Sequence, residues 1–107
     1  MSKIIYNKLV RDLIPDIIIE SGKSCHTRVL SDEEYLEQID LKLDEELAEY
    51  HSDQNLEELA DLLELIYAAA RARGYTTEAL EAKRAEKAAN RGAFEKKILL
   101  IDVSEKD

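Results

Sequence analysis

Acidic side chains at helical spacing are concentrated in the middle of this sequence. The stretch LDEELAEYHSDQNLEELADLLE, from Leu43 to Glu64, contains eight acids besides Asp53. A carboxylate on a solvated helix face needs no partner. A buried carboxylate costs several kcal/mol unless it is paired, protonated or bound to a metal ion. The chemistry of the stretch therefore depends on which of these acids face inward.

The apolar residues of the first acidic helix locate its inward face, because an ideal α-helix advances about 100° per residue. That face is defined by Leu36, Ile39, Leu43, Leu47 and Tyr50. Glu46 projects about 20° from Ile39, and Glu49 lies on the flank of the apolar arc. Glu45 points well away from it. Glu46 is therefore misplaced for a purely solvated acid.

The second acidic helix has an apolar arc of roughly 200° in the same projection. The arc contains Leu56, Leu59, Leu62, Leu63, Leu65, Ile66 and Ala69. Glu58 falls within the arc and Asp61 lies at its edge, whereas Glu57 and Glu64 lie on the opposite side. An arc this wide exceeds what the core of one small domain usually covers. We therefore expect a homodimer or a higher homo-oligomer.

Each acidic helix carries one inward pair of acids at i,i+3 spacing. The pairs are Glu46 with Glu49 and Glu58 with Asp61. Helices joined by a short connector pack antiparallel, so the two pairs can meet at one location. Hard divalent cations such as Mg²⁺, or Mn²⁺ as an alternative, prefer oxygen ligands of this kind. The other interpretation is that the acids only border the apolar stripe and pair with Lys and Arg from elsewhere.

The scarcity of residues that break regular structure favours a mainly α fold, since the chain has only three glycines and one proline. Helices are predicted over residues 16–21, 31–50, 54–74 and 76–91. Ser31 begins a capping box, and Gly74 and Gly92 are placed to end helices. Two β-prone runs, CHTRVL at 25–30 and ILLIDV at 98–103, are predicted to pair into a small β element beside the helices. We expect residues 1–107 to form a single domain.

Composition limits the partners. The formal net charge is −9, which opposes nucleic acid, and no apolar run approaches the ~20 residues that a bilayer requires. The N-terminus lacks the apolar core of a signal peptide, and Cys25 is the single cysteine, so a cytoplasmic location is expected. A phosphorylated partner should be a small molecule.

Several segments resemble one enzyme superfamily. Glu45-Glu46-x-x-Glu49 followed by Glu58-x-x-Asp61 is similar to the EExxE…ExxD signature of the MazG-like, all-α nucleoside triphosphate pyrophosphohydrolases. The segments YNKLVRDLIPDII, RVLSDEEYLEQ and RGAFEKKI look like a compact single-domain branch related to phosphoribosyl-ATP pyrophosphohydrolase. The resemblance covers nearly the whole chain. One departure is the short spacer of eight residues between the two halves of the acidic signature, which leaves less room for a substrate-selecting loop.

The resemblance implies a function and a set of site residues. It implies an all-α, pyrophosphatase-like helical bundle that hydrolyses a nucleoside triphosphate to a nucleoside monophosphate and pyrophosphate, as in nucleotide-pool house-cleaning. Mg²⁺ would be held by Glu46, Glu49, Glu58 and Asp61. Catalytic roles fall to Glu46, Glu49 and, as a water-orienting group, Glu45. Which carboxylate acts as the base is left open.

Basic residues form two candidate substrate-binding sets. Lys83, Lys87 and Arg91 recur on one ridge at i, i+4 and i+8, with Asn90 beside them. Alternatively, this ridge pairs with nearby glutamates such as Glu81 and Glu86 on a solvated helix. The second set is Lys8, Arg11 and Asp12, which the resemblance places near the active site.

Two other functions fit the same pattern. One is hydrolysis of phosphoribosyl-ATP, or of another pyrophosphate-linked metabolite, at the same metal site. The other is a catalytically silent helical interaction module that keeps the fold. The absence of any response to metal would favour the silent module.

Overall fold

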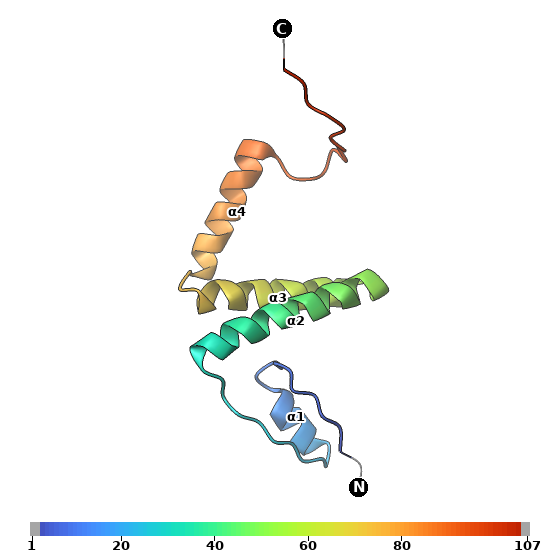
Figure 1. Cartoon of the computed structure of the whole chain (residues 1–107), viewed down its shortest axis with the longest axis vertical. Helices are drawn as coiled ribbons and strands as arrows, with labels where there is room; N and C mark the ends of the chain where they lie inside the picture. The colour runs from blue at the N-terminus through green and yellow to red at the C-terminus, as the bar shows by residue number, and fades with distance from the viewer. Residues whose placement is uncertain (1–2, 106–107) are drawn as a thin grey trace.

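The described part of the chain, residues 3–105 of a computed structural model, contains four α-helices, with extended segments before the first helix, between the first and the second, and after the fourth (Figure 1). The helices are α1 (Ile14–Glu20), α2 (Asp32–Asp53), α3 (Leu56–Ala72) and α4 (Thr77–Arg91). The predicted mainly α fold is confirmed. Each predicted helix is present, with ends that differ from the prediction by up to three residues.

Side-chain capping fixes the start of α2. The backbone N–H of Glu34 donates to Ser31 Oγ at 3.2 Å, and the Ser31 N–H donates to Glu34 Oε1 at 3.3 Å. Arg28 adds two hydrogen bonds to the same carboxylate, at 3.2 and 2.8 Å. The predicted capping box is thus confirmed. The helix continues to Asp53, beyond its predicted end at Tyr50.

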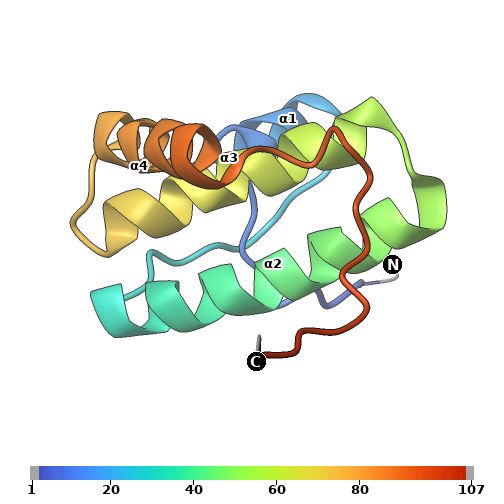
Figure 2. The same ribbon diagram turned by 90° about the horizontal axis from the view of Figure 1, so that it is seen from above.

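A very short turn reverses the chain between α2 and α3. Gln54 adopts the left-handed conformation at φ 51°, and Asn55 caps α3 by accepting from the Glu58 N–H at 3.0 Å. The turn is shorter than the predicted connector, residues 51–55. It makes α2 and α3 an antiparallel hairpin whose helices lie side by side in both views (Figure 2). This hairpin brings the two acidic motifs together.

The two shorter helices follow the expected local chemistry. Pro15 lies in the first turn of α1, where its missing N–H costs nothing. Thr76 caps α4 by accepting from the Ala79 N–H at 3.0 Å. Gly92 ends α4 at φ 83°, a conformation that disfavours residues with a Cβ.

The predicted β element is wrong. Segments 25–30 and 98–103 are extended, but none of residues 3–105 forms a strand. They lie at opposite ends of the molecule, because α4 carries the C-terminal segment away from the hairpin (Figure 1). Val29 is 98% exposed and Ile101 is 86% exposed. β propensity reflects packing on a neighbouring strand, and within one chain neither segment has such a neighbour.

The core of a single chain is very small. Ile39 is the buried apolar residue among those described, at 1% exposure, and Glu46 is the buried charged residue, at 7%. On α3, the half-buried residues include Glu58, Asp61, Leu62 and Leu65. The adjoining stripe stays exposed and consists of Leu56, Leu59, Leu63 and Ile66. The hairpin therefore covers only one edge of the wide apolar arc predicted for α3.

The chain is elongated. It measures 73 × 31 × 21 Å, and its radius of gyration is 19.1 Å, against about 13 Å for a compact domain of this length. α4 contacts α3 near the end of the hairpin and then leans away, and the C-terminal segment continues beyond it (Figure 1). None of the helices in residues 3–105 combines the length and apolar character needed to cross a membrane.

Candidate metal centre

The hairpin buries Glu46 as the projection predicted, but the prediction is wrong for its two neighbours. Glu45, predicted to point well away, is half-buried under its contacts with Lys8 and Lys42. Glu49, predicted as an inward acid, is exposed. Glu46 is buried against α3, and Glu58 and Asp61 are half-buried on the opposing face. Glu57 and Glu64 are exposed, as expected for ordinary surface charge. The inward direction of Glu46 is therefore confirmed, and its cause is the short turn that locks α2 against α3.

Five acids of the hairpin form two overlapping groups of three. One carboxylate oxygen from each of Glu45, Glu46 and Glu49 lies within 4.8 Å of the others, and the same holds for Glu46, Glu58 and Asp61. We call these groups the α2 triad and the cross-helix triad; Glu46 belongs to both. Oxygen ligands of one Mg²⁺ lie roughly 3 Å apart when adjacent and roughly 4 Å apart when opposite. The acids of either triad are thus near enough to converge on one ion after their side chains move closer.

Two buried oxygens at this centre have no partner. Oε2 of Glu46 and Oε2 of Glu58 are shielded from solvent and accept no hydrogen bond. A buried polar atom left without a partner costs about 1–3 kcal/mol, and a charged one costs more. A hard cation would satisfy both atoms, since anionic oxygens are its preferred ligands. The residues present therefore fit a divalent cation such as Mg²⁺.

Crowding of these carboxylates shifts their affinity for protons. Burial, and next the adjacent Glu49, raise the pKa of Glu46 to about 7. Burial and Glu49 also raise the pKa of Glu58. By contrast, the hydrogen bond from Lys8 lowers the pKa of Glu45, with a further contribution from Lys42. The centre thus contains one acid, Glu45, whose charged form is favoured, and two acids, Glu46 and Glu58, whose protonated form is favoured.

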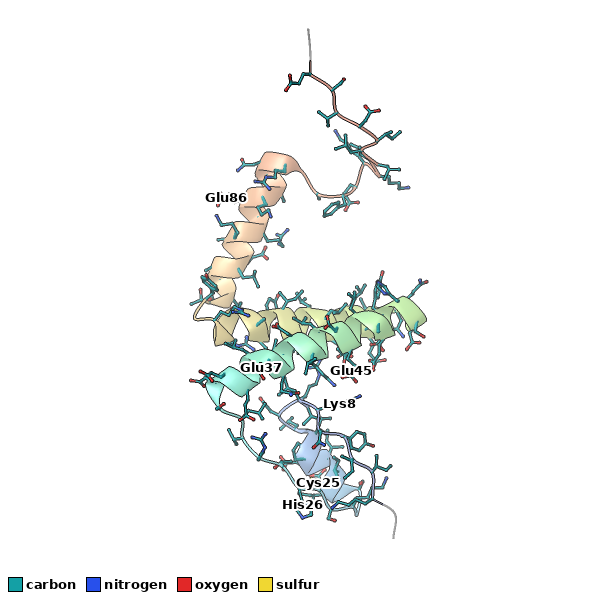
Figure 3. The ribbon with its side chains drawn as sticks, viewed as in Figure 1. Lys8, Cys25, His26, Glu37, Glu45 and Glu86 are labelled. Carbon is teal, nitrogen blue, oxygen red and sulfur yellow. The ribbon has the colours of Figure 1, made fainter. Side chains whose placement is uncertain are left out.

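The N-terminal segment supplies two cations to this centre. Lys8 Nζ donates to Glu45 Oε1 at 3.0 Å, and an Arg11 guanidinium N–H donates to Asp61 Oδ1 at 2.6 Å. Figure 3 shows Lys8 below α2, next to Glu45. The structure therefore brings Lys8 and Arg11 to the acids, while Asp12 is exposed. The NKLVRD segment lies at the centre although it is distant in sequence.

Sequence reasoning missed Lys42. Its ammonium group lies 3.3 Å from Glu45 Oε2 and 3.7 Å from Glu46 Oε1. The signal was present, because Lys42 stands at i,i+3 and i,i+4 from these two acids, the spacing at which helical side chains meet. Lys42 therefore gives partial charge compensation from within α2.

The predicted basic ridge on α4 lies elsewhere in the single chain. Lys83, Lys87, Asn90 and Arg91 are all exposed, and α4 contacts α3 but not α2. Lys83 pairs with Glu86 at 3.2 Å, as the solvated-helix alternative predicted. Figure 3 shows Glu86 far from Glu45. One chain thus does not bring this ridge to the acids, and its contact with substrate stays a prediction.

Comparison with known proteins adds one relative. A curated protein of Mycolicibacterium smegmatis (strain ATCC 700084 / mc(2)155), described as an uncharacterized protein, is 55% identical over 42 residues. The match covers 39% of this chain and 43% of that protein, so the chain spans less than half the length of its relative. No family model matches the chain, and no solved structure matches it. The relative's description carries no activity.

Proposed function

We propose that this protein is a Mg²⁺-dependent hydrolase that cleaves a nucleoside triphosphate to a nucleoside monophosphate and pyrophosphate. One observation carries the metal centre: the buried Glu46, with an unpartnered oxygen, stands where carboxylates from two helices converge. The substrate class rests on the likeness of the acidic and terminal segments to MazG-like pyrophosphohydrolases. A nucleotide substrate fits a cytoplasmic enzyme, and the net charge of −9 disfavours nucleic acid.

The charge balance of the site explains why a cation is needed. Clustered carboxylates repel a polyphosphate, and the three cations Lys8, Arg11 and Lys42 do not fully offset the five acids of the two triads. When bound, a divalent cation supplies positive charge against the phosphate oxygens and lowers the pKa of nearby water. The cross-helix triad, which joins α2 to α3, is best placed to hold such an ion.

The α2 triad offers groups with different roles. Glu45 accepts hydrogen bonds from both Lys8 and Lys42, so it is a weak proton acceptor and is suited to positioning. Glu49 is the exposed member of the triad and lies beside Glu46. It is therefore the carboxylate with the best access to water, and we assign to it the orientation of the attacking water.

An open hollow adjoins these acids on the side of the N-terminal segment. It is lined by Lys8, Leu9, Gln38, Leu41, Lys42 and Glu45. Two of the lining side chains carry ammonium groups, which are suitable phosphate contacts, and two are leucines. The hollow gives a phosphate chain an approach to the centre that does not cross the buried face of the hairpin.

The test separates the acids of the centre from other surface acids. Glu46, Glu49, Glu58 and Asp61 should each be replaced by the isosteric amide, with Glu57→Gln and Glu64→Gln as controls. The four variants at the centre should lose Mg²⁺-dependent release of pyrophosphate while circular dichroism shows intact helices, because an amide keeps the shape but lacks the anionic oxygen that the cation or the attacking water needs. The two controls should retain turnover. Equal losses in both groups would refute the centre.

The substrate panel decides between the related activities. Canonical and damaged nucleoside triphosphates and phosphoribosyl-ATP should be compared with Mg²⁺, with pyrophosphate measured separately from orthophosphate. Pyrophosphate from a nucleoside triphosphate supports the proposal. Turnover of phosphoribosyl-ATP alone would show that phosphoribosyl-ATP, and not a nucleoside triphosphate, is the substrate. No turnover together with no metal binding supports a silent interaction module.

We also propose that the active form contains at least two copies of the chain. One chain exposes 10046 Å², whereas a compact monomer of this mass exposes about 6,000 Å². The excess is several times the roughly 800 Å² per partner that a stable interface needs. The bare stripe of Leu56, Leu59, Leu63 and Ile66 is the part of this excess that lies on α3. A second copy covering this stripe would complete the core.

A further inference from the structure

Each carboxylate triad has one member that is held by a cation from the N-terminal segment. Arg11 binds Asp61 of the cross-helix triad at 2.6 Å, and Lys8 binds Glu45 of the α2 triad at 3.0 Å. The two cations are three positions apart in a segment that has no helical structure before Leu13. One short piece of extended chain thus reaches acids on both helices of the hairpin.

We propose that Lys8 and Arg11 are displaceable counter-ions, which hold the centre together without metal and give up their ion pairs when a divalent cation binds. This inference rests on the proposed metal centre. It adds that loading of the centre and release of the N-terminal segment are one coupled event.

The exposure of the three basic side chains shows which of them can leave. The side chains of Lys8 and Arg11 are 50% and 56% exposed, whereas that of Lys42 is 20% exposed and is fixed by the helix that carries the acids. Exposed ion pairs are weak, because water competes for both partners. Lys8 and Arg11 can therefore turn to solvent at little cost, while Lys42 stays.

The acceptor atoms show why a cation has to compete with these residues. Both oxygens of Glu45 already accept hydrogen bonds, Oε1 from Lys8 and Oε2 from Lys42. Oδ1 of Asp61 accepts from Arg11. In contrast, the unpartnered Oε2 atoms of Glu46 and Glu58 are ready for a ligand. An incoming cation thus finds two vacant oxygens and must compete with Arg11 for Asp61 Oδ1 and with Lys8 for Glu45 Oε1.

The first experiment measures Mg²⁺ binding by calorimetry in the wild type, Arg11→Ala and Lys8→Ala. Arg84→Ala is the matched control, because Arg84 forms an exposed pair with Glu81 on α4 at 2.8 Å and carries the same charge. Removing Arg11 or Lys8 should tighten Mg²⁺ binding by roughly two- to fivefold, since a competitor is lost. The control should change the affinity less than twofold.

The second experiment detects displacement itself, since loss of a nearby positive charge alone can tighten metal binding. The heteronuclear NOE of backbone amides 6–12 reports their motion on the picosecond to nanosecond timescale. Addition of Mg²⁺ to the wild type should lower these values while those of α2 and α3 stay high. Unchanged or higher values for residues 6–12 would overturn the inference even if the affinities shift.

The outcomes separate this inference from the proposed function. If Mg²⁺ binds the wild type and Arg11→Ala equally well, the counter-ion role is wrong and the metal centre stands. If Mg²⁺ binds only the two variants, the counter-ion role is supported, but the proposed Mg²⁺-dependent function of the wild-type protein is refuted. If Mg²⁺ binds none of them, both proposals fail.

Discussion

Replacement of Glu46 by glutamine gives the sharpest test of how the centre is built. The pKa of Glu46 is raised from 4.5 to about 7, with burial as the largest cause. At 1.36 kcal/mol per pKa unit, this difference corresponds to about 3 kcal/mol of folding free energy. The side chain is only 10% exposed, so screening by solvent reduces this value little.

Because the pKa of Glu46 is raised on folding, its effect on stability has a definite dependence on pH. The folded state holds the Glu46 proton more tightly, so its contribution to stability is complete below pH 4.5 and is lost as the pH rises through about 7. Glutamine stays neutral at every pH. Without metal, Glu46→Gln should therefore be more stable than the wild type by about 1 kcal/mol at pH 5.5 and about 3 kcal/mol at pH 8.

The assay is urea denaturation followed by circular dichroism at pH 5.5 and pH 8, with a chelator and at one fixed protein concentration. Comparison of the two proteins at the same pH cancels the titration of distant groups. Addition of Mg²⁺ at pH 8 should then stabilise the wild type but not Glu46→Gln, because only the wild type keeps the ligand. The exposed Glu57→Gln should differ from the wild type by no more than about 0.5 kcal/mol at either pH.

Two results would refute this reasoning. A gain in stability that is equal at the two pH values would show that the Glu46 charge is not the cause. A Glu46→Gln variant that is less stable than the wild type at pH 8 would show that the carboxylate is compensated in the folded protein, and the unpartnered oxygen would then carry no argument for a cation.

Further predictions concern the helices and their assembly. Ser31→Ala should lower the free energy of unfolding by about 1 kcal/mol in urea denaturation, because α2 loses its cap; no change would mean that the Arg28 contact to Glu34 suffices. Ile39→Ala should cost about 2–4 kcal/mol in the same assay, since Ile39 is fully buried between the helices. Sedimentation should show a dimer or larger species that Leu59→Glu shifts toward monomer, and a strict monomer at micromolar concentration contradicts the proposed assembly.

The sequence by itself determined the local features of this protein. Caps act within three or four residues, so Ser31 and Gly92 marked helix ends that the structure confirms. Helical periodicity is equally local. It identified Glu46 as an inward acid and placed Glu57 on the solvated face before any tertiary contact was known.

Only the tertiary structure decided the contacts between distant segments. Nothing in the spacing of Lys8 and Arg11 shows that they bind acids 37 and 50 positions away. The wrong β element has the same cause, because a strand needs a neighbouring strand and sequence spacing does not show whether one is present. The course of α4 carries segment 98–103 away from segment 25–30. Periodicity located the apolar arc of α3, but the packing of α2 against its edge determined that the stripe from Leu56 to Ile66 stays bare. Local propensity fixes the elements, whereas their partners depend on the path of the whole chain.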